Sequence, residues 1–158
     1  MCRYLLIAIL SMFPIIVNAQ SIGPREGWIV FPTQYSFKEL VNRTRAAVKK
    51  APITIVSQAS ASSGAHNKGF EIPGNRVIGI YRNDYARRML AASVAAGVEA
   101  PIRLYLTENE NNTATLSYKT PSSVFAPYMD EGGEDLQTLA VELDAIFLGI
   151  ARSVASDP

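Results

Sequence analysis

Apolar and polar residues follow two different periods along the chain, and these periods predict strands and helices. Strand-like segments are either short apolar runs or runs in which apolar and polar residues alternate. They lie at residues 28–31, 53–56, 77–81, 102–107 and 113–118. The polar residues 108–112 separate the last two segments, so we expect a β-hairpin with one face buried from solvent. The run at 77–81 is apolar throughout, which predicts an interior strand.

Longer segments with apolar residues at helical spacing predict helices. They run from 36 to 50, from 83 to about 97 and from about 134 to 152. The first begins at a capping box formed by Ser36 and Glu39, and Pro52 stops it. The cap of the second is expected at Asn83 or Asp84.

Residues 57–74 are rich in Ser, Ala and Gly, and we expect them to be irregular or briefly helical. Residues 121–128 are expected to form a short helix, and Gly132-Gly133 a hinge or loop. This mixed order of strands and helices predicts an α+β fold in which helices pack on a mostly antiparallel sheet. The predicted core contains Trp28, Val30, Leu40, Val77, Ile80, Leu104, Leu116, Leu139, Leu143 and Phe147.

Residues 1–19 have the pattern of a secretory signal peptide. Arg3 precedes an apolar run, and Val17 and Ala19 are suited to the −3 and −1 positions of a cleavage site before Gln20. The rival interpretation is an uncleaved anchor, but the run is shorter than the roughly 20 residues that span a bilayer. We therefore expect an exported protein, periplasmic or extracellular, whose single domain is residues 20–158 and which has no membrane span after cleavage. The single cysteine, Cys2, would be removed with the signal peptide.

Charge is balanced over the whole chain and polarised along it. Lys and Arg number 15, and Asp and Glu number 14, so no strong net field indicates a nucleic-acid partner. Residues 20–103 contain 12 basic and 5 acidic residues, whereas residues 104–158 contain 2 basic and 9 acidic ones. Either the two halves interleave in the fold, or they form complementary surfaces. The second alternative predicts a homodimer that loosens as salt rises.

Motifs that could carry catalysis lack the residues that their chemistry requires. His66, the only histidine, lies near serines and Glu71, but no G-x-S-x-G elbow surrounds a nucleophile. Gly64 and Gly69 have the spacing of a phosphate loop without the Lys-Ser/Thr pair that follows it. The acidic residues at 130–135 lack EF-hand spacing. We therefore expect no metal, no cofactor and no catalytic residue from these motifs.

Several landmarks occur in a fixed order along the chain. They are the Trp/Phe strand at 28–31, the capped first helix, a strand that leads to Asn83, the segment Glu99-Ala100-Pro101, Tyr118 in the hairpin, Pro121 and a long last helix. In this order the chain, over about residues 27–154, resembles the DUF302 family of uncharacterised proteins. The resemblance implies a compact α+β domain that often stands alone, and it implies no established catalytic residues. The chain departs from the family pattern at Arg82 and Asp84, where Gly and Pro are usual, and at Ala100, where Leu is usual.

The start of the second helix is the place where the sequence could hold an anion. Free N–H groups and the dipole at a helix start attract anions. Arg82, Asn83, Arg87 and Arg88 crowd this end, where cations are normally unfavourable. The alternative is that acidic residues pair with these arginines at the surface. Asp84, Glu99 and the acids of the last third of the chain are the candidates for this pairing.

Two main classes of function remain open at this point, with a structural or envelope-stress protein that binds no ligand as a third. The first is a non-enzymatic exported module that binds a partner protein or a small, for example anionic, ligand, or that self-associates. The second is an enzyme with an unrecognised carboxylate or tyrosine-based site. Two buried acids in one pocket would favour the enzyme, whereas a continuous core with a shallow surface groove would favour the binding module.

The signal-peptide pattern predicts that the exported protein begins at Gln20. The intact mass of the protein isolated from outside the cytoplasm should correspond to residues 20–158. A mass that retains residues 1–19 would show that the segment is an anchor instead.

Overall fold

The structure is a computed structural model that describes residues 22–156, so the predicted signal peptide lies outside the described residues. Its centre is one antiparallel sheet of five strands in the order β1-β5-β4-β3-β2. The strands are β1 (Trp28–Pro32), β2 (Thr54–Ala59), β3 (Asn75–Tyr81), β4 (Ile102–Glu108) and β5 (Ala114–Lys119). All five predicted strands are present, and β3 is an interior strand between β4 and β2.

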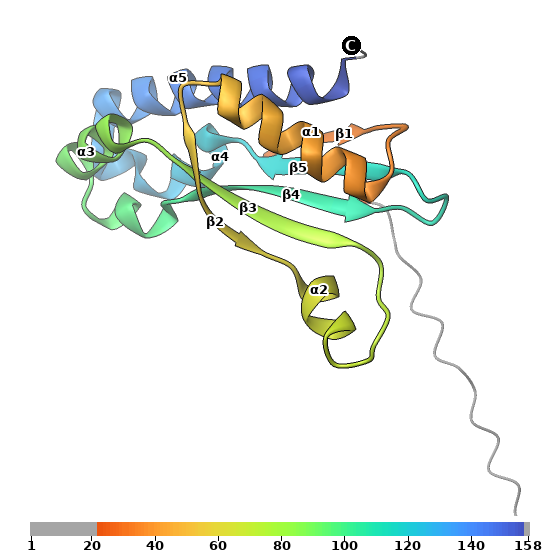
Figure 1. Cartoon of the computed structure of the whole chain (residues 1–158). Coiled ribbons are helices and arrows are strands. Elements are labelled where there is room, and N and C mark those ends of the chain that lie inside the picture. The colour runs from red at the N-terminus through yellow and green to blue at the C-terminus, as the bar shows by residue number, and fades with distance from the viewer. Residues whose placement is uncertain (1–21, 157–158) are drawn as a thin grey trace, which may run out of the picture.

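The helices lie mainly on one face of the sheet (Figure 1). They are α1 (Phe37–Lys50), α2 (Ala61–His66), α3 (Asn83–Ala92), η1 (Ala95–Glu99), α4 (Pro121–Phe125), η2 (Ala126–Tyr128) and α5 (Met129–Ala155). Helices α1, α3 and α5 lie together, and α2 projects away on the other side of the sheet (Figure 1). This arrangement confirms the predicted α+β fold of helices packed on an antiparallel sheet.

Helix α1 follows directly from its sequence pattern. The Ser36 hydroxyl accepts a hydrogen bond from the Glu39 backbone N–H at 3.3 Å, as the capping box requires. The side chains that point at the sheet recur every three or four residues and are buried. They are Leu40, Val41, Thr44, Ala47 and Val48. The helix therefore covers one end of the sheet with a single apolar stripe.

Helix α5 bends at the predicted glycine hinge. Gly133 has φ 55° and ψ −147°, a backbone conformation that glycine adopts without the penalty of a side chain. Beyond the bend the helix is straight and buries one face against the sheet and α1. The buried residues in that stretch are Leu136, Leu139, Ala140, Leu143, Phe147, Ile150, Ala151 and Val154.

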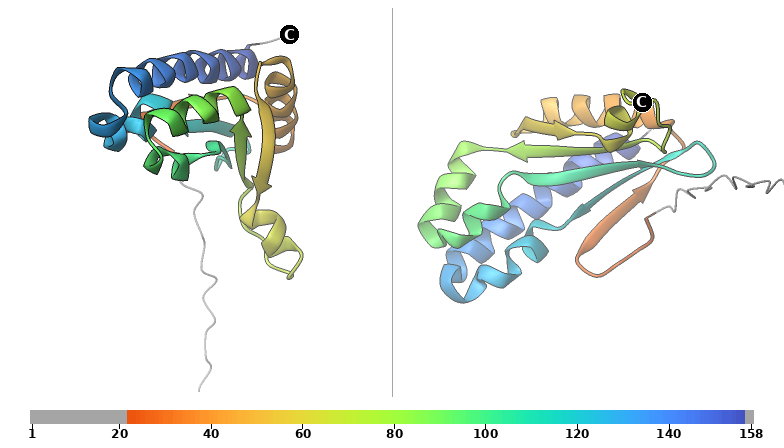
Figure 2. Two further views of the ribbon diagram at one scale, coloured as in Figure 1. Left: turned by 90° about the vertical axis from the view of Figure 1, so that its left-hand side faces the viewer. Right: turned by 90° about the horizontal axis from the view of Figure 1, so that it is seen from below.

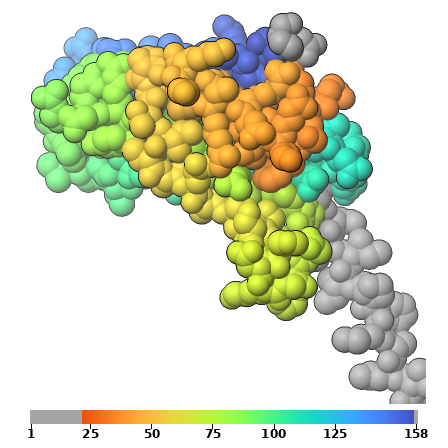
Figure 3. All heavy atoms as spheres, in the orientation of Figure 1, coloured from red at the N-terminus to blue at the C-terminus, as the bar shows by residue number. Residues whose placement is uncertain are grey.

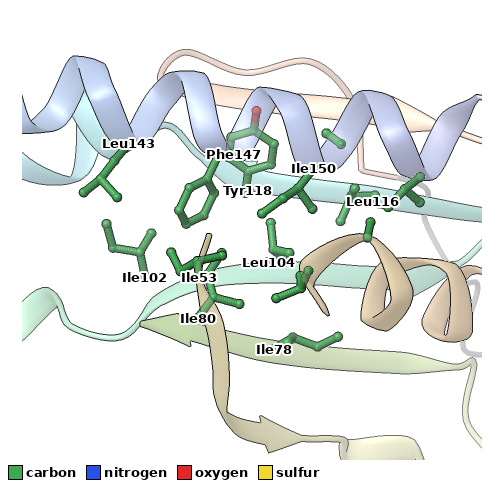
Figure 4. Packing of buried hydrophobic residues seen from close by; sticks show 14 of the residues in the cluster. Ile53, Ile78, Ile80, Ile102, Leu104, Leu116, Tyr118, Leu143, Phe147 and Ile150 are labelled. Carbon is green, nitrogen blue, oxygen red and sulfur yellow. The ribbon is translucent and has the colours of Figure 1, made fainter. Parts of the chain in front are cut away.

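The core fills the space between the sheet and α5 (Figure 4). Side chains from β3, β4 and β5 point up toward the helix, and those of Leu143, Phe147 and Ile150 point down to meet them (Figure 4). The Tyr118 ring packs against the Phe147 ring with centroids 5.4 Å apart. Burial raises the pKa of Tyr118 to about 12, and the charge of Asp144 acts in the same direction.

Three of the ten predicted core residues do not belong to the core. Trp28, Val30 and Val77 are only half-buried and lie on the face of the sheet away from α5, which corrects the prediction. The reason is strand alternation: in β1 it is Ile29 and Phe31 that pack against the core. An unbroken apolar run does not show which of its two alternating sets faces the helices. The remaining seven predicted residues are buried together.

The second helix is shorter than predicted. Helix α3 ends at Ala92, because Ser93 is extended with φ −150° and ψ 117°. The Ser93 hydroxyl then accepts a hydrogen bond from the Ala96 N–H at 3.0 Å and starts the 3-10 turn η1. The residue before the helix is Arg82, whose side chain makes no capping bond, so Asn83 and Asp84 lie inside the helix.

A substitution at Leu143 tests whether α5 holds the helical layer on the sheet. The Leu143 side chain is 5% exposed within the core cluster, so Leu143→Ala removes apolar contacts and leaves a cavity. We expect a loss of about 2–5 kcal/mol in the free energy of unfolding, measured by urea denaturation. A loss below about 0.5 kcal/mol would show that α5 does not cover the sheet as described.

Candidate functional site

The face of the sheet opposite α5 carries a groove. In the view from below, the strands lie in front of α5 and no helix crosses the middle of the sheet (Figure 2). The groove has a volume of about 500 Å³ and is half open to solvent. The residues that line it come from all five strands, the start of α2, η1 and α4. They are Trp28, Ala59, Ser60, Ala61, Asn75, Val77, Glu99, Ile102, Arg103, Tyr105, Tyr118, Lys119 and Val124.

Register brings the middle of the groove together from residues far apart in the sequence. Tyr105 pairs with Ser117 on one side and with Val77 on the other. Val77 in turn pairs with Ala59, and Ser117 pairs with Val30. Residues paired in this way point to the same face of a sheet. The floor of the groove is therefore an apolar and aromatic band across the uncovered face.

A tight turn places Trp28 at one side of the groove. Gly27 has φ 70°, and a side chain on it would collide with the Ser123 side chain. The Thr120 N–H donates to the Gly27 carbonyl at 2.9 Å, which ties the turn to the end of β5. The Arg25 guanidinium lies 5.3 Å from the centre of the Trp28 ring, a cation–π distance. These contacts hold the indole at the groove wall.

The opposite side of the groove is the base of a projecting arm, residues 60–74, which contains α2. The space-filling view shows the arm extending from the body of the molecule (Figure 3). Asn75 fixes its base, because its Oδ1 accepts hydrogen bonds from the N–H groups of Ala61 at 2.9 Å and Ser62 at 3.4 Å. The Ser62 hydroxyl accepts from the Asn75 N–H at 3.1 Å. The arm is thus anchored to β3 where it borders the groove.

Glu99 is the carboxylate in the groove lining, and a tyrosine holds it. The Tyr128 hydroxyl donates a hydrogen bond to Glu99 Oε1 at 2.9 Å. This hydrogen bond, together with burial, raises the pKa of Tyr128. Beside this pair the Ser93 hydroxyl bonds to Glu131. The end of the groove at η1 is therefore a fixed polar cluster.

The predicted anion site lies elsewhere, on α3. Arg82 donates two hydrogen bonds of 2.6 Å to Asp84, and Arg88 donates two of 2.7 and 2.9 Å to Glu142. These hydrogen bonds lower the pKa of both carboxyl groups. Asn83 and Arg87 are exposed beside them. The two ion pairs are of the kind that the surface-pairing alternative describes, and Glu142 belongs to the acidic last third of the chain.

The other motifs from the sequence lie outside the groove lining. His66 Nδ1 and Glu71 Oε1 are 2.8 Å apart on the arm, and both side chains are exposed. Between residues 22 and 156 no three His, Cys, Asp or Glu side chains are grouped so that they could hold a metal ion. Within the same part of the chain no helix has the length and apolar character needed to cross a membrane.

Comparison with known proteins agrees with this fold. The sequence model of the family described as "Domain of unknown function DUF302" matches residues 29–150. The chain belongs to the DUF302 family. The crystal structure of an uncharacterised conserved DUF302 protein from Bacillus stearothermophilus is similar, with a TM-score of 0.70 over 82% of this chain and 98% of that chain. The two sequences are 15% identical, so the likeness concerns the fold. No curated protein matches the chain.

Sequence reasoning missed the groove in this DUF302 protein, although a signal was present. In β4 the residues that alternate with the core positions are Arg103, Tyr105 and Thr107. Their alternation with buried leucines shows that they face away from the core. Neighbouring strands have to be known before these residues can be placed next to Trp28, Val77 and Lys119.

The anion site at Arg82, Asn83, Arg87 and Arg88 stays a prediction that calorimetry can test. Asp84 and Glu142 already bind two of the guanidinium groups, so an added anion has to displace them. We therefore expect roughly millimolar binding of phosphate or sulfate, lost in the variant Arg82→Ala/Arg88→Ala. Equal and negligible heats in both proteins would eliminate the site.

Proposed function

We propose that this DUF302 protein is an exported, non-enzymatic binding module whose groove takes one small molecule. The groove on the uncovered sheet face is the observation that supports the proposal. Its volume of about 500 Å³ falls in the range of small-molecule sites, which are apolar hollows with a few polar groups. Trp28 and Tyr105 offer ring faces to an apolar body.

The position of the groove also supports a binding role. The core lies on the other side of the sheet and is continuous from α3 to the end of α5. Of the groove residues, Ile102 and Tyr118 belong to this core and Val124 packs against it, whereas those on the uncovered face are not needed to complete it. Antiparallel sheets of this kind usually present a polar face to water. Here the band formed by Trp28, Val77 and Tyr105 departs from that pattern. A ligand with an apolar body would cover this band.

The alternative function is an enzyme that uses Glu99 and Tyr128. One specific observation favours it: the two side chains form a hydrogen-bonded acid pair at one end of the groove. However, the Tyr128 hydroxyl donates its hydrogen bond to Glu99, so in this arrangement the tyrosine positions the carboxylate. A mechanism with two carboxylates needs both of them in the groove lining. Among the residues that line the groove, Glu99 is the single carboxylate. The binding role is therefore the better account.

Self-association is a second form of the binding role. Leu90, Val94 and Val98 are exposed on α3 and η1 by 46%, 79% and 76%. Exposed apolar patches often lie at contacts between proteins. This patch supports the predicted homodimer, which stays a prediction.

Trp28 reports directly on the groove, because it is the only tryptophan in the chain. We expect the uncharged probe N-phenyl-1-naphthylamine to bind with energy transfer from Trp28. Val77→Phe fills the groove and should weaken this binding about tenfold or more. A matched control is Val141→Phe, which adds the same bulk at an exposed site of α5 outside the groove and should leave the affinity unchanged.

Both variants are first checked for folding by circular dichroism and thermal melting. If the probe binds Val77→Phe as tightly as it binds the original protein, the groove is not a ligand site. The same conclusion follows if the bound probe shows no energy transfer from Trp28 in either protein.

A further inference from the structure

Two cations, Arg103 and Lys119, line the groove on the uncovered face of the sheet. The pairing of β4 with β5 ends with Tyr105 opposite Ser117. Arg103 and Lys119 lie two residues beyond this pair, so they are on neighbouring strands and on the same face as Tyr105. Lys119 also pairs with Trp28 on the next strand.

Neither cation forms an ion pair with another residue in the described part of the chain. The ion pairs among residues 22–156 involve other cations, namely Arg43, His66, Arg82 and Arg88. Glu99, the carboxylate of the groove, accepts a hydrogen bond from Tyr128 instead. At the start of α3, by contrast, Arg82 and Arg88 each have a carboxylate partner.

The cations and the aromatic band belong to the same groove. Arg103 and Lys119 line it together with Trp28, Val77 and Tyr105. Tyr105 is two residues along β4 from Arg103, so the Cα atoms of these two residues are about 7 Å apart. A molecule of moderate size can therefore reach both residues. Its acid group would lie at Arg103 and Lys119, and its ring system would lie against the apolar and aromatic side chains of the groove.

We propose that the groove selects organic anions: an aromatic or alicyclic body that carries one carboxylate, sulfonate or phosphate group. The acid group lies between Arg103 and Lys119 and gives both cations the ion-pair partner that they lack among the described residues. Arginine suits this role, because its planar guanidinium can make two parallel hydrogen bonds to such a group. The body packs on Trp28, Val77 and Tyr105. This inference rests on the proposed function, since it assumes that the groove is a ligand site.

Two fluorescent probes with the same aromatic body separate charge recognition from apolar binding. N-phenyl-1-naphthylamine is uncharged, and 1-anilinonaphthalene-8-sulfonate adds one sulfonate to that body. We expect the original protein to bind the sulfonate about tenfold more tightly than the uncharged probe, both with energy transfer from Trp28. The preference should shrink as salt rises, because the two cations are exposed.

The variant Arg103→Gln/Lys119→Gln should remove this preference. We expect it to weaken binding of the sulfonate about tenfold and to leave the uncharged probe within about twofold. The matched control Lys49→Gln/Lys50→Gln removes the same charge from the exposed end of α1, on the other side of the sheet, and should leave both affinities unchanged.

The outcomes distinguish this inference from the proposed function. If both probes bind with equal affinity, or if the groove variant weakens them equally, the anion preference is wrong while the groove remains a ligand site. If the control variant weakens the sulfonate as much as the groove variant does, general charge attraction explains the result and the inference is wrong. If Val77→Phe leaves both probes bound as before, the probes bind elsewhere, and both the function and the inference are overturned.

Discussion

The packing of α5 on one face of the sheet is the interaction on which the rest of the structure depends. From Leu136 to Val154 the helix buries a continuous apolar stripe against β3, β4 and β5, with the Phe147 and Tyr118 rings in contact at its middle. The bend at Gly133 lets the helix start beside η1 and still run along the sheet. Helices α1 and α3 lie on either end of the same face. Because all three helices are on one side, the other side of the sheet is left for a ligand or for solvent.

Strand alternation then determines what the uncovered face offers. Each strand that supplies a leucine or isoleucine to the core has to present its neighbouring residues on the opposite side. In β4 these are Arg103 and Tyr105, in β3 Val77, and in β1 Trp28. The groove is thus made by the same backbone that holds the core, on five rigid strands. Sites built on strands hold their side chains more firmly than sites built on loops.

The arginine–carboxylate ion pairs among the described residues lie outside the groove. Arg43, Arg82 and Arg88 pair with carboxylates, and Arg88 and Glu142 join the basic and acidic halves directly. That contact supports the view that the halves interleave in the fold. In the groove, Arg103 and Lys119 have no such partner among the described residues. An exported binding module with an anionic ligand would account for this difference, and the Glu99–Tyr128 pair would then form the polar end of its site.

Local patterns in the sequence were sufficient for the elements and for most of the core. The capping box at Ser36, the alternation in the hairpin and the stripe of α5 each depend on residues close in the chain, so their prediction was confirmed. The errors have two causes. Trp28, Val30 and Val77 were assigned to the core because an apolar run in a strand does not show which alternate residues face inward. Helix α3 was extended past Ser93 because the hydrogen bond from the Ala96 N–H to the Ser93 hydroxyl was not foreseen. The pairing of Trp28 with Lys119, and the place of both in one groove with Arg103, involve residues up to 91 positions apart. Only the tertiary structure decided these contacts, because hydrogen bonding between strands brings such residues together and no local pattern records which strands become neighbours.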